Sequence, residues 1–256
     1  MEKISAVIVA HNEEKKILDC LKSLDFTDEI VVVLDKCTDK TKTIILEYSK
    51  KIKIIEGAWE IEGARRNIAL NSASYNWILE IDADEIISDN LKNEILKTIK
   101  NSPPSGFVIP INNHIGKKCI KHGWLRTICV LDRLTLTYKG LKKYHEDKMI
   151  HPTFNFVGNK YNLLNPINHF VDDDISDLIL RFNRYTNWKA NDLITKQKKL
   201  PNLLKLIFDF KLRFCKAYIL KKGYKEGLIG FLIAILAGLY PLVTYLKVKE
   251  KLNENS

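Results

Sequence analysis

The sequence has few of the residues that are typical of disulfide-stabilised, secreted or repetitive proteins. Its 256 residues include 5 cysteines, 7 prolines and 11 glycines, and no two cysteines form a Cys-x-x-Cys pair. We find no internal repeat, no low-complexity segment, and no basic segment followed by an apolar run at the start of the chain. A hydrophobic share of 46% is too high for a disordered chain. We therefore expect a globular protein in a reducing, cytoplasmic compartment.

Positive charge is concentrated in the C-terminal third of the chain. Residues 1–174 contain 25 Lys and Arg against 25 Asp and Glu, whereas residues 175–256 contain 16 against 6 and so carry the whole net charge of +10. The longest uncharged apolar run, 228–246, lies in the same segment. A basic, apolar tail on a neutral body predicts an anionic membrane surface as a partner. Because the tail has no nucleic-acid-binding motif, we expect no nucleic-acid partner.

Strands and helices alternate over the first hundred residues. Short apolar runs predict strands over 4–10, 29–35, 53–56 and 77–82. Helical spacing predicts helices from Ile17, over 40–50 behind an Asp39 N-cap, over 62–73, and after Ser88. This alternation predicts an α/β fold with a mostly parallel sheet flanked by helices. No Gly-x-Gly-x-x-Gly follows the first strand, which disfavours a dinucleotide-binding dehydrogenase.

The pattern changes after the Pro- and Gly-containing stretch at 102–106. Residues 107–111 and 127–138 predict an added antiparallel segment. Residues 175–222 are basic and predicted to be helical with a break at Pro201, and a final apolar helix follows. We therefore expect three segments, 1–102, 103–174 and 175–256.

Asp82 and Asp84 follow the fourth predicted strand. Because side chains alternate along a strand, we expect both to point to the same side, together with Glu80. Carboxylates so close raise one another's pKa unless a cation lies between them. Mg²⁺ and Mn²⁺ prefer such oxygen ligands. The alternative is a loop of solvated acids in front of the helix that Ser88 caps.

Polar residues also follow the first two predicted strands. Asn12 and Glu13 come after the first strand, and Asp35 and Asp39 after the second. Asn12 and Asp39 also suit ordinary N-cap positions. Ligands of open α/β sheets bind at the carboxyl ends of the strands, so three polar strand ends at one rim favour a binding site.

Four motifs together resemble the family-2 glycosyltransferases of GT-A fold: AVIVAHNEE at 6–14, EIVVVLDKCTD at 29–39, EGARRNIAL at 62–70 and NWILEIDADE at 76–85. The later HGWLRTICVLDR, YHED and NHF, with the basic apolar tail, are similar to the lipopolysaccharide-core β-glucosyltransferases of that family. The resemblance implies a Rossmann-like GT-A fold. Residues 1–102 would form the nucleotide-sugar-binding half, 103–174 the acceptor side of the same catalytic domain, and 175–256 a membrane-associated tail.

The resemblance also implies roles for individual residues. Asp84 would bind a Mg²⁺ or Mn²⁺ ion that bridges the diphosphate of a UDP-sugar, with His169 as a further candidate ligand. Glu80 stands where the family usually has an apolar residue, and Tyr144 stands where valine is usual. Contacts with the nucleotide sugar fall on Ala10, Asn12, Glu13, Asp35, Asp39, Arg66, Asn67 and Asp82.

Glycosyl transfer needs a base for the acceptor hydroxyl and a cation for the leaving diphosphate. Glu146 is our candidate base, with Asp147 and Asp132 as rivals, and the resemblance implies inversion by one direct displacement. Arg126 and Arg133 are interpreted either as phosphate or acceptor ligands or as charges on a strand edge. Trp124 would either stack on a sugar ring or pack in the core.

We therefore expect a metal-dependent, inverting transferase that moves a hexose, glucose by the resemblance, to a lipopolysaccharide-core or other cell-envelope glycan. Two alternatives stay open. Transfer to a polyprenyl phosphate would need no base, and a catalytically silent membrane protein would bind the nucleotide sugar without turnover. The run 228–246 would span about 28 Å as a helix, close to the bilayer core. We favour a helix that lies in or dips into the cytoplasmic leaflet of the inner membrane, over a true span or a core or dimer helix.

Overall fold

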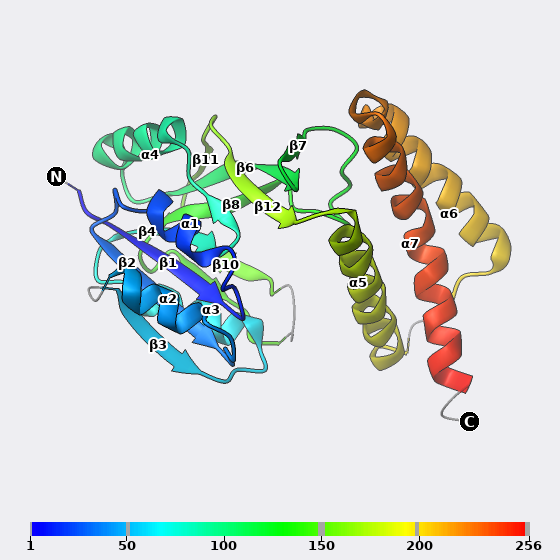
Figure 1. The fold of residues 1–256 in the computed structure, drawn as a ribbon, viewed down its shortest axis with the longest axis horizontal. Coiled ribbons are helices and arrows are strands. Elements are labelled where there is room, and N and C mark those ends of the chain that lie inside the picture. Colours follow the sequence, from blue (N-terminus) through cyan, green and yellow to red (C-terminus); the bar gives the residue numbers. More distant parts are fainter. Residues whose placement is uncertain (1, 50–51, 148–151, 198–199, 254–256) are drawn as a thin grey trace. The chain divides into compact units, whose positions relative to one another are not determined.

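The computed structural model describes residues 2–49, 52–147, 152–197 and 200–253. The chain forms two compact units (Figure 1). Unit 1 consists of Met1–Ile111 and Asp132–His169, and unit 2 of Asn112–Leu131 and Phe170–Ser256. The functional division into 1–102, 103–174 and 175–256 stays a prediction.

The sheet of unit 1 is parallel in its first half. Its parallel strands follow the order β3 (Lys53–Gly57), β2 (Glu29–Asp35), β1 (Ile4–Ala10) and β4 (Trp77–Asp82). The antiparallel addition begins with β8 (Asp132–Tyr138), which pairs with β4, and β6 (Gly106–Ile115), which pairs with β8. At one end, β5 (Glu85–Ile86) pairs antiparallel with β12 (Ile167–Asp172), and β11 (Lys160–Asn162) runs parallel to β6. The predicted α/β class with an antiparallel addition is confirmed.

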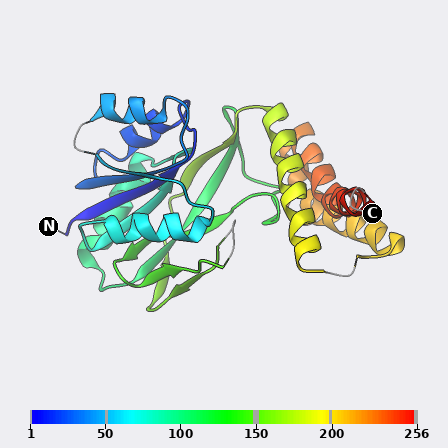
Figure 2. The same ribbon diagram turned by 90° about the horizontal axis from the view of Figure 1, so that it is seen from below.

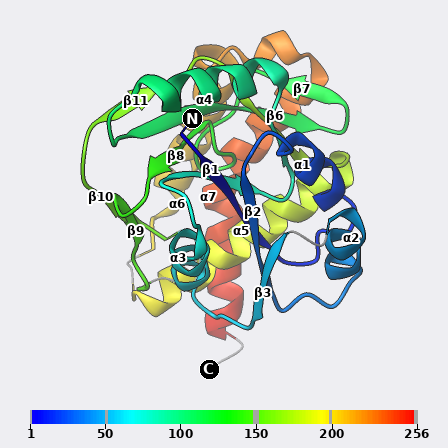
Figure 3. The ribbon, with the colours of Figure 1, turned by 90° about the vertical axis from the view of Figure 1, so that its left-hand side faces the viewer.

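Helices cover both faces of this sheet (Figure 3). On one face lie α1 (Ile17–Ser23), α2 (Thr41–Tyr48) and α4 (Asp89–Asn101), and on the other lies α3 (Glu62–Ser72). Strand alternation decides which residue faces which layer: Ile8 packs in the first core, whereas Val7 packs with Leu70 of α3. By the same alternation, Glu80 and Asp82 of β4 face α3.

A small antiparallel sheet completes unit 1. It consists of β9 (Lys142–Tyr144) and β10 (Phe154–Phe156), and Tyr144 packs in the core beside α3.

The predicted strand over 127–138 is wrong in its first part. The strand β8 begins at Asp132, and before it residues 126–128 form a turn that is followed by a bend at 129. Ile128 and Cys129 are neighbours in sequence and are both buried in the core of unit 2. A strand would send adjacent side chains to opposite faces, so a turn serves this burial better.

Unit 2 is built around three long helices, α5 (Ile175–Thr195), α6 (Leu203–Cys215) and α7 (Leu228–Asn253) (Figure 2). The predicted break at Pro201 separates α5 from α6, which continues as a short π-helix (Lys216–Leu220) before a 3₁₀ turn (Gly223–Glu226). The short strand β7 (Lys118–Ile120) pairs with the end of β6. Helix α7 packs against both α5 and α6. It is long and apolar enough to cross a membrane by length and composition, and 39% of its most apolar stretch is buried.

Candidate active site

The loops after β1 and β2 are tied together at the carboxyl rim of the sheet. Asn12, whose φ is 56°, accepts the N–H groups of Thr38 (2.8 Å) and Asp39 (3.3 Å) with its side-chain oxygen. Asp39 in turn accepts the N–H groups of Thr41 (2.9 Å) and Glu14 (3.0 Å). The Asp39 carboxylate thus binds the first backbone N–H of α2, but the N-cap of this helix is Lys40, so the predicted Asp39 N-cap and the helix start are each wrong by one residue.

Glu13 lies in a strongly acidic part of this rim. Its burial and the nearby charges of Asp84, Asp82 and Asp39 raise the pKa of Glu13 to about 7, although Lys16 acts in the opposite direction. Burial contributes most to this shift, and the nearby carboxylates add to it.

Asp35 and Ala10 are both buried at the rim. The Asp35 carboxylate accepts the N–H of Trp59 (2.9 Å) and pairs with Arg65. The carbonyl oxygen of Ala10 accepts the thiol of Cys37 (3.5 Å).

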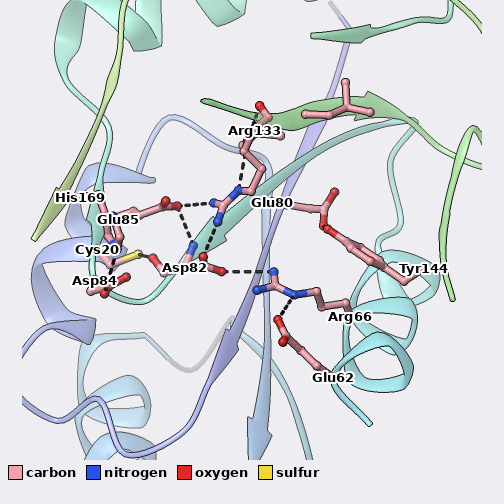
Figure 4. A network of polar contacts seen from close by, with 12 residues as sticks. Cys20, Glu62, Arg66, Glu80, Asp82, Asp84, Glu85, Arg133, Tyr144 and His169 are labelled. Carbon is pink, nitrogen blue, oxygen red and sulfur yellow. Dashed lines mark hydrogen bonds and ion pairs between the residues drawn. The ribbon is translucent and has the colours of Figure 1, made fainter. Parts of the chain in front are cut away.

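Asp82 lies between two guanidinium groups at the end of β4 (Figure 4). Arg66 donates to its Oδ1 at 3.2 Å, and Arg133 donates to its Oδ2. Burial alone would raise the pKa of Asp82, but the charges of Arg133 and Arg66 outweigh it and hold that pKa below its usual range. A second nitrogen of Arg133 binds Glu85 at 2.5 Å, and burial raises the pKa of that carboxyl.

Asp84 does not share these partners. It lies in the turn between β4 and β5, so the strand alternation that was expected to align it with Asp82 does not reach it. Its Oδ2 is 3.3 Å from Nε2 of His169. His169 is brought there because β12 pairs with β5 and places it opposite Glu85. Two residues that are 85 positions apart in sequence therefore meet at the rim.

The Asp84–His169 pair fits a divalent cation. Both side chains are partly exposed, at 23% and 14%, so a ligand can reach them. Mg²⁺ is usually held by one or two carboxylates together with substrate phosphates, and Mn²⁺ accepts a similar donor set. Within the described ranges, no group of three or more His, Cys, Asp or Glu side chains is arranged to hold a metal. Substrate oxygens would therefore supply the remaining ligands.

Glu146 is held by the same helix that contacts Asp82. Asn67 of α3 donates to Glu146 Oε1 at 2.8 Å. Its side chain also donates to the carbonyl oxygen of Tyr144 at 2.9 Å and accepts the backbone N–H of Tyr144 at 2.8 Å. The preceding residue, Arg66, binds Asp82. Helix α3 approaches this loop closely, because a Cβ on Gly63 would lie only 2.1 Å from the carbonyl oxygen of His145. The glycine of the EGARRNIAL motif is thereby explained.

A buried charged pair lies next to this cluster on the α3 side of β4. Lys142 Nζ donates to Glu80 Oε1 at 2.5 Å, and the hydroxyl of Tyr144 donates to Glu80 Oε2 at 2.8 Å. Nζ also lies 4.6 Å from the ring centroids of both Tyr144 and Phe154. The charge of Glu80, which the sequence left without an explanation, is thus fully paired.

Two of the open alternatives are decided by burial and topology. Trp124 is buried in unit 2 and donates its ring N–H to the carbonyl of Ile120 at 2.8 Å, so it is a core residue. Arg133 lies on β8, between β4 and β6, so it is not a strand-edge charge. Arg126 is exposed in unit 2.

Several residues of the site were missed at the level of sequence. Arg65, Trp59, Glu85 and Lys142 make contacts with residues far away in the chain. One local signal was readable: Glu62 and Arg66, four residues apart on α3, form an ion pair at 2.8 Å.

The sheet, the helices on its two faces and the acidic rim define a glycosyltransferase of GT-A architecture. The model of the family described as "Glycosyl transferase family 2" matches residues 5–162, which is more than half of the sequence. The chain belongs to this family.

Similar proteins agree with this assignment. An uncharacterized glycosyltransferase of Rickettsia conorii is 26% identical over 264 residues, covering 97% of this chain and 90% of the relative. The lipopolysaccharide core biosynthesis glycosyltransferase LpsC of Rhizobium meliloti is 26% identical over 254 residues, covering 97% and 92%. The crystal structure of S. aureus TarS is similar with a TM-score of 0.50 and 18% identity, covering 98% of this chain and 54% of TarS. That likeness reflects the fold alone.

Proposed function

We propose that this enzyme transfers a hexose, glucose in the first instance, from a UDP-sugar to a lipopolysaccharide-core or other cell-envelope glycan, with inversion and with a divalent metal. The acceptor is lipid-linked, so the enzyme works at the cytoplasmic face of the inner membrane, with its basic tail against anionic lipid. The named relative LpsC supports the choice of acceptor.

The meeting of Asp84 with His169 carries this proposal. The two residues come from a turn and a strand far apart in sequence, and their side-chain atoms approach to 3.3 Å at the rim. Burial and the charges of Asp84, Asp82 and Asp39 raise the pKa of Glu13 to about 7, which reflects the acidic surroundings of this pair. A carboxylate and an imidazole in an acidic, partly exposed position suit a cation that also binds a diphosphate.

The roles of the other residues follow from their contacts. Asp84 and His169 would hold Mg²⁺ or Mn²⁺, which when bound neutralises the charge that grows on the leaving diphosphate. Asp82 stays ionised between Arg66 and Arg133, and its free lone pairs can accept sugar or ribose hydroxyls. Asn12, Glu13, Asp35 and Asp39 line the nucleotide side of the rim.

Glu146 acts as the general base. The hydrogen bond from Asn67 fixes one carboxylate oxygen and leaves the other for the acceptor hydroxyl. The acceptor oxygen loses its proton to Glu146 as it attacks the anomeric carbon, and the diphosphate leaves from the opposite face. Inversion follows from that single displacement.

Calorimetric titration of UDP into the full chain tests the donor site. We expect binding with Mn²⁺ that is lost with EDTA and in Asp84→Ala. The matched control is Asp19→Ala, which removes an exposed carboxylate of α1 paired with Lys22 and should bind UDP like the wild type. Absence of UDP binding by the wild type with Mn²⁺ present would overturn the proposal. Donor hydrolysis over a set of UDP-hexoses would then identify the sugar.

A further inference from the structure

Helix α6 and the π-helix that continues it have apolar residues on two opposite sides. The inner side packs into unit 2, where Leu206 and Ala217 are buried and Phe214 contacts the core. Phe210 lies against α7, since a Cβ on Gly238 would be 2.9 Å from its ring. This side accounts for the packing of α6 against α7 (Figure 1).

The opposite side carries a row of exposed apolar residues. Leu204, Phe208, Leu212 and Ile219 are 77%, 64%, 53% and 57% exposed. Leu204, Phe208 and Leu212 are four residues apart and Ile219 follows seven residues later, spacings that keep them on one face of a helix over about four turns. Single exposed apolar residues are ordinary on a soluble protein, but a contiguous row of this length marks an interaction surface. We refer to these four residues as the outer face of α6.

Lysines border the outer face on both sides. At 100° per residue, Lys205 and Lys216 fall along one edge of the row and Lys211 along the other, and all three are exposed. Asp209 is the single acidic residue of 203–220. Lysine stems can cover apolar surface while their ammonium groups reach anionic headgroups. An apolar row framed by lysines is typical of a helix that lies in a bilayer interface.

Helix α7 is less suited to this role, although it contains the longest apolar run. Ile233, Ala234 and Ala237 are buried in the core of unit 2, and the helix packs against α5 and α6. Most of its remaining apolar residues are only half exposed. The apolar run therefore serves the packing of unit 2 in large part, whereas the outer face of α6 has no such use among the described residues.

We propose that the outer face of α6 inserts into the headgroup region of an anionic lipid bilayer. The inference specifies the membrane contact of the proposed function, and it is independent of the donor, the metal and the reaction. The apolar side chains of the row would insert between the lipids, and the bordering lysines would attract anionic headgroups.

Vesicle flotation with the full chain tests this surface. We expect the wild type to float with vesicles that contain phosphatidylglycerol and much less with pure phosphatidylcholine. The double variant Phe208→Ser/Leu212→Ser should partition at least about tenfold more weakly to both. The matched control is Val157→Ser/Leu164→Ser, which removes two apolar residues of unit 1 that are 72% and 85% exposed. This control should float like the wild type.

Two further measurements make the test decisive. Lys205→Gln/Lys211→Gln/Lys216→Gln should lose the preference for anionic vesicles while keeping weak binding to neutral ones. In Phe208→Trp, tryptophan emission should shift to the blue when anionic vesicles are added. Wild-type flotation of the Phe208→Ser/Leu212→Ser variant would overturn the proposal. The proposal would also be overturned if the wild type does not bind vesicles and sedimentation without lipid shows a dimer that the same substitutions dissociate.

The outcomes also separate this inference from the proposed function. UDP titration of the variants in α6 and its π-helix should match the wild type, because their substituted residues lie in unit 2 and the donor site in unit 1. If the wild type binds vesicles through α6 but does not bind UDP, the proposed function fails and the membrane surface stands. If UDP binds and no variant changes flotation, the membrane surface on α6 fails and the proposed function stands.

Discussion

The hydroxyl of Tyr144 donates a hydrogen bond of 2.8 Å to Glu80, 64 positions away in the sequence. Both residues depart from the usual pattern of the family, which has a valine and an apolar residue at these positions. Lys142 completes the arrangement by donating to the other oxygen of Glu80 at 2.5 Å. The two departures are therefore one polar interaction, buried between β4 and β9.

Removing one charge of this pair should destabilise the protein strongly. The side chains of Lys142 and Glu80 are only 1% and 6% exposed, so Lys142→Met leaves an unpaired buried carboxylate. We expect a loss of about 3–5 kcal/mol in the free energy of unfolding, measured by urea denaturation. The double variant Glu80→Gln/Lys142→Met removes both charges and keeps an acceptor for Tyr144, so it should be more stable than Lys142→Met. A double variant no more stable than the single one would contradict this account.

The layers of the fold were readable from sequence because their signals are local. The strand over 77–82 and the helix over 62–73 appear almost as predicted, since apolar periodicity and breaks lie within a few residues. The same rule failed at 127–131, where consecutive apolar residues look like a strand but pack in the core of unit 2.

From the sequence, the candidate site could be predicted only as polar and charged residue types at the ends of predicted strands. Asp84 and His169 were both named, but their meeting depends on the pairing of β12 with β5, which no local pattern specifies. Arg133 was assigned to phosphate binding or to an edge, and its contacts with Asp82 and Glu85 depend on the place of β8 in the sheet. Non-local register therefore limits what sequence can predict here.

Arg133→Met should destabilise unit 1 more at neutral than at acidic pH. Arg133 helps hold the pKa of Asp82 below its usual value, so the ion pair stabilises the fold above about pH 4 and is lost as the pH falls further. In the variant, Asp82 and Glu85 become protonated at a higher pH than in the wild type. The loss in the free energy of unfolding is therefore smaller at acidic pH. We expect a loss of about 3 kcal/mol near pH 7 and a clearly smaller one near pH 4.5.

Urea denaturation over this pH range measures the difference. The control is Lys143→Met, which removes an exposed positive charge of β9 in unit 1 and should change the free energy of unfolding by less than about 0.5 kcal/mol. A loss for Arg133→Met that does not change with pH would show that packing, rather than charge, explains it.

Removing the imidazole beside Asp84 should weaken metal activation. In His169→Gln, the Mn²⁺ concentration needed for half-maximal UDP binding should rise roughly 10- to 100-fold, with UDP affinity recovering at saturating metal. His122→Gln is the control, because His122 lies in unit 2 and is bonded to Glu226 at 2.8 Å. Equal Mn²⁺ dependence of the two variants and the wild type would remove His169 from the metal site.

Glu146→Gln should remove the general base while leaving the donor site intact. Gln can still accept the hydrogen bond from Asn67, so the loop should keep its place, but it cannot take a proton from the acceptor. We expect kcat for transfer to a glycan acceptor to fall about 10²- to 10⁴-fold, with unchanged UDP binding. The rivals Asp147→Asn and Asp132→Asn should each retain most of the activity. If the wild type does not act on a glycan, while both the wild type and Glu146→Gln transfer fully to a polyprenyl phosphate, the acceptor is instead one that needs no deprotonation.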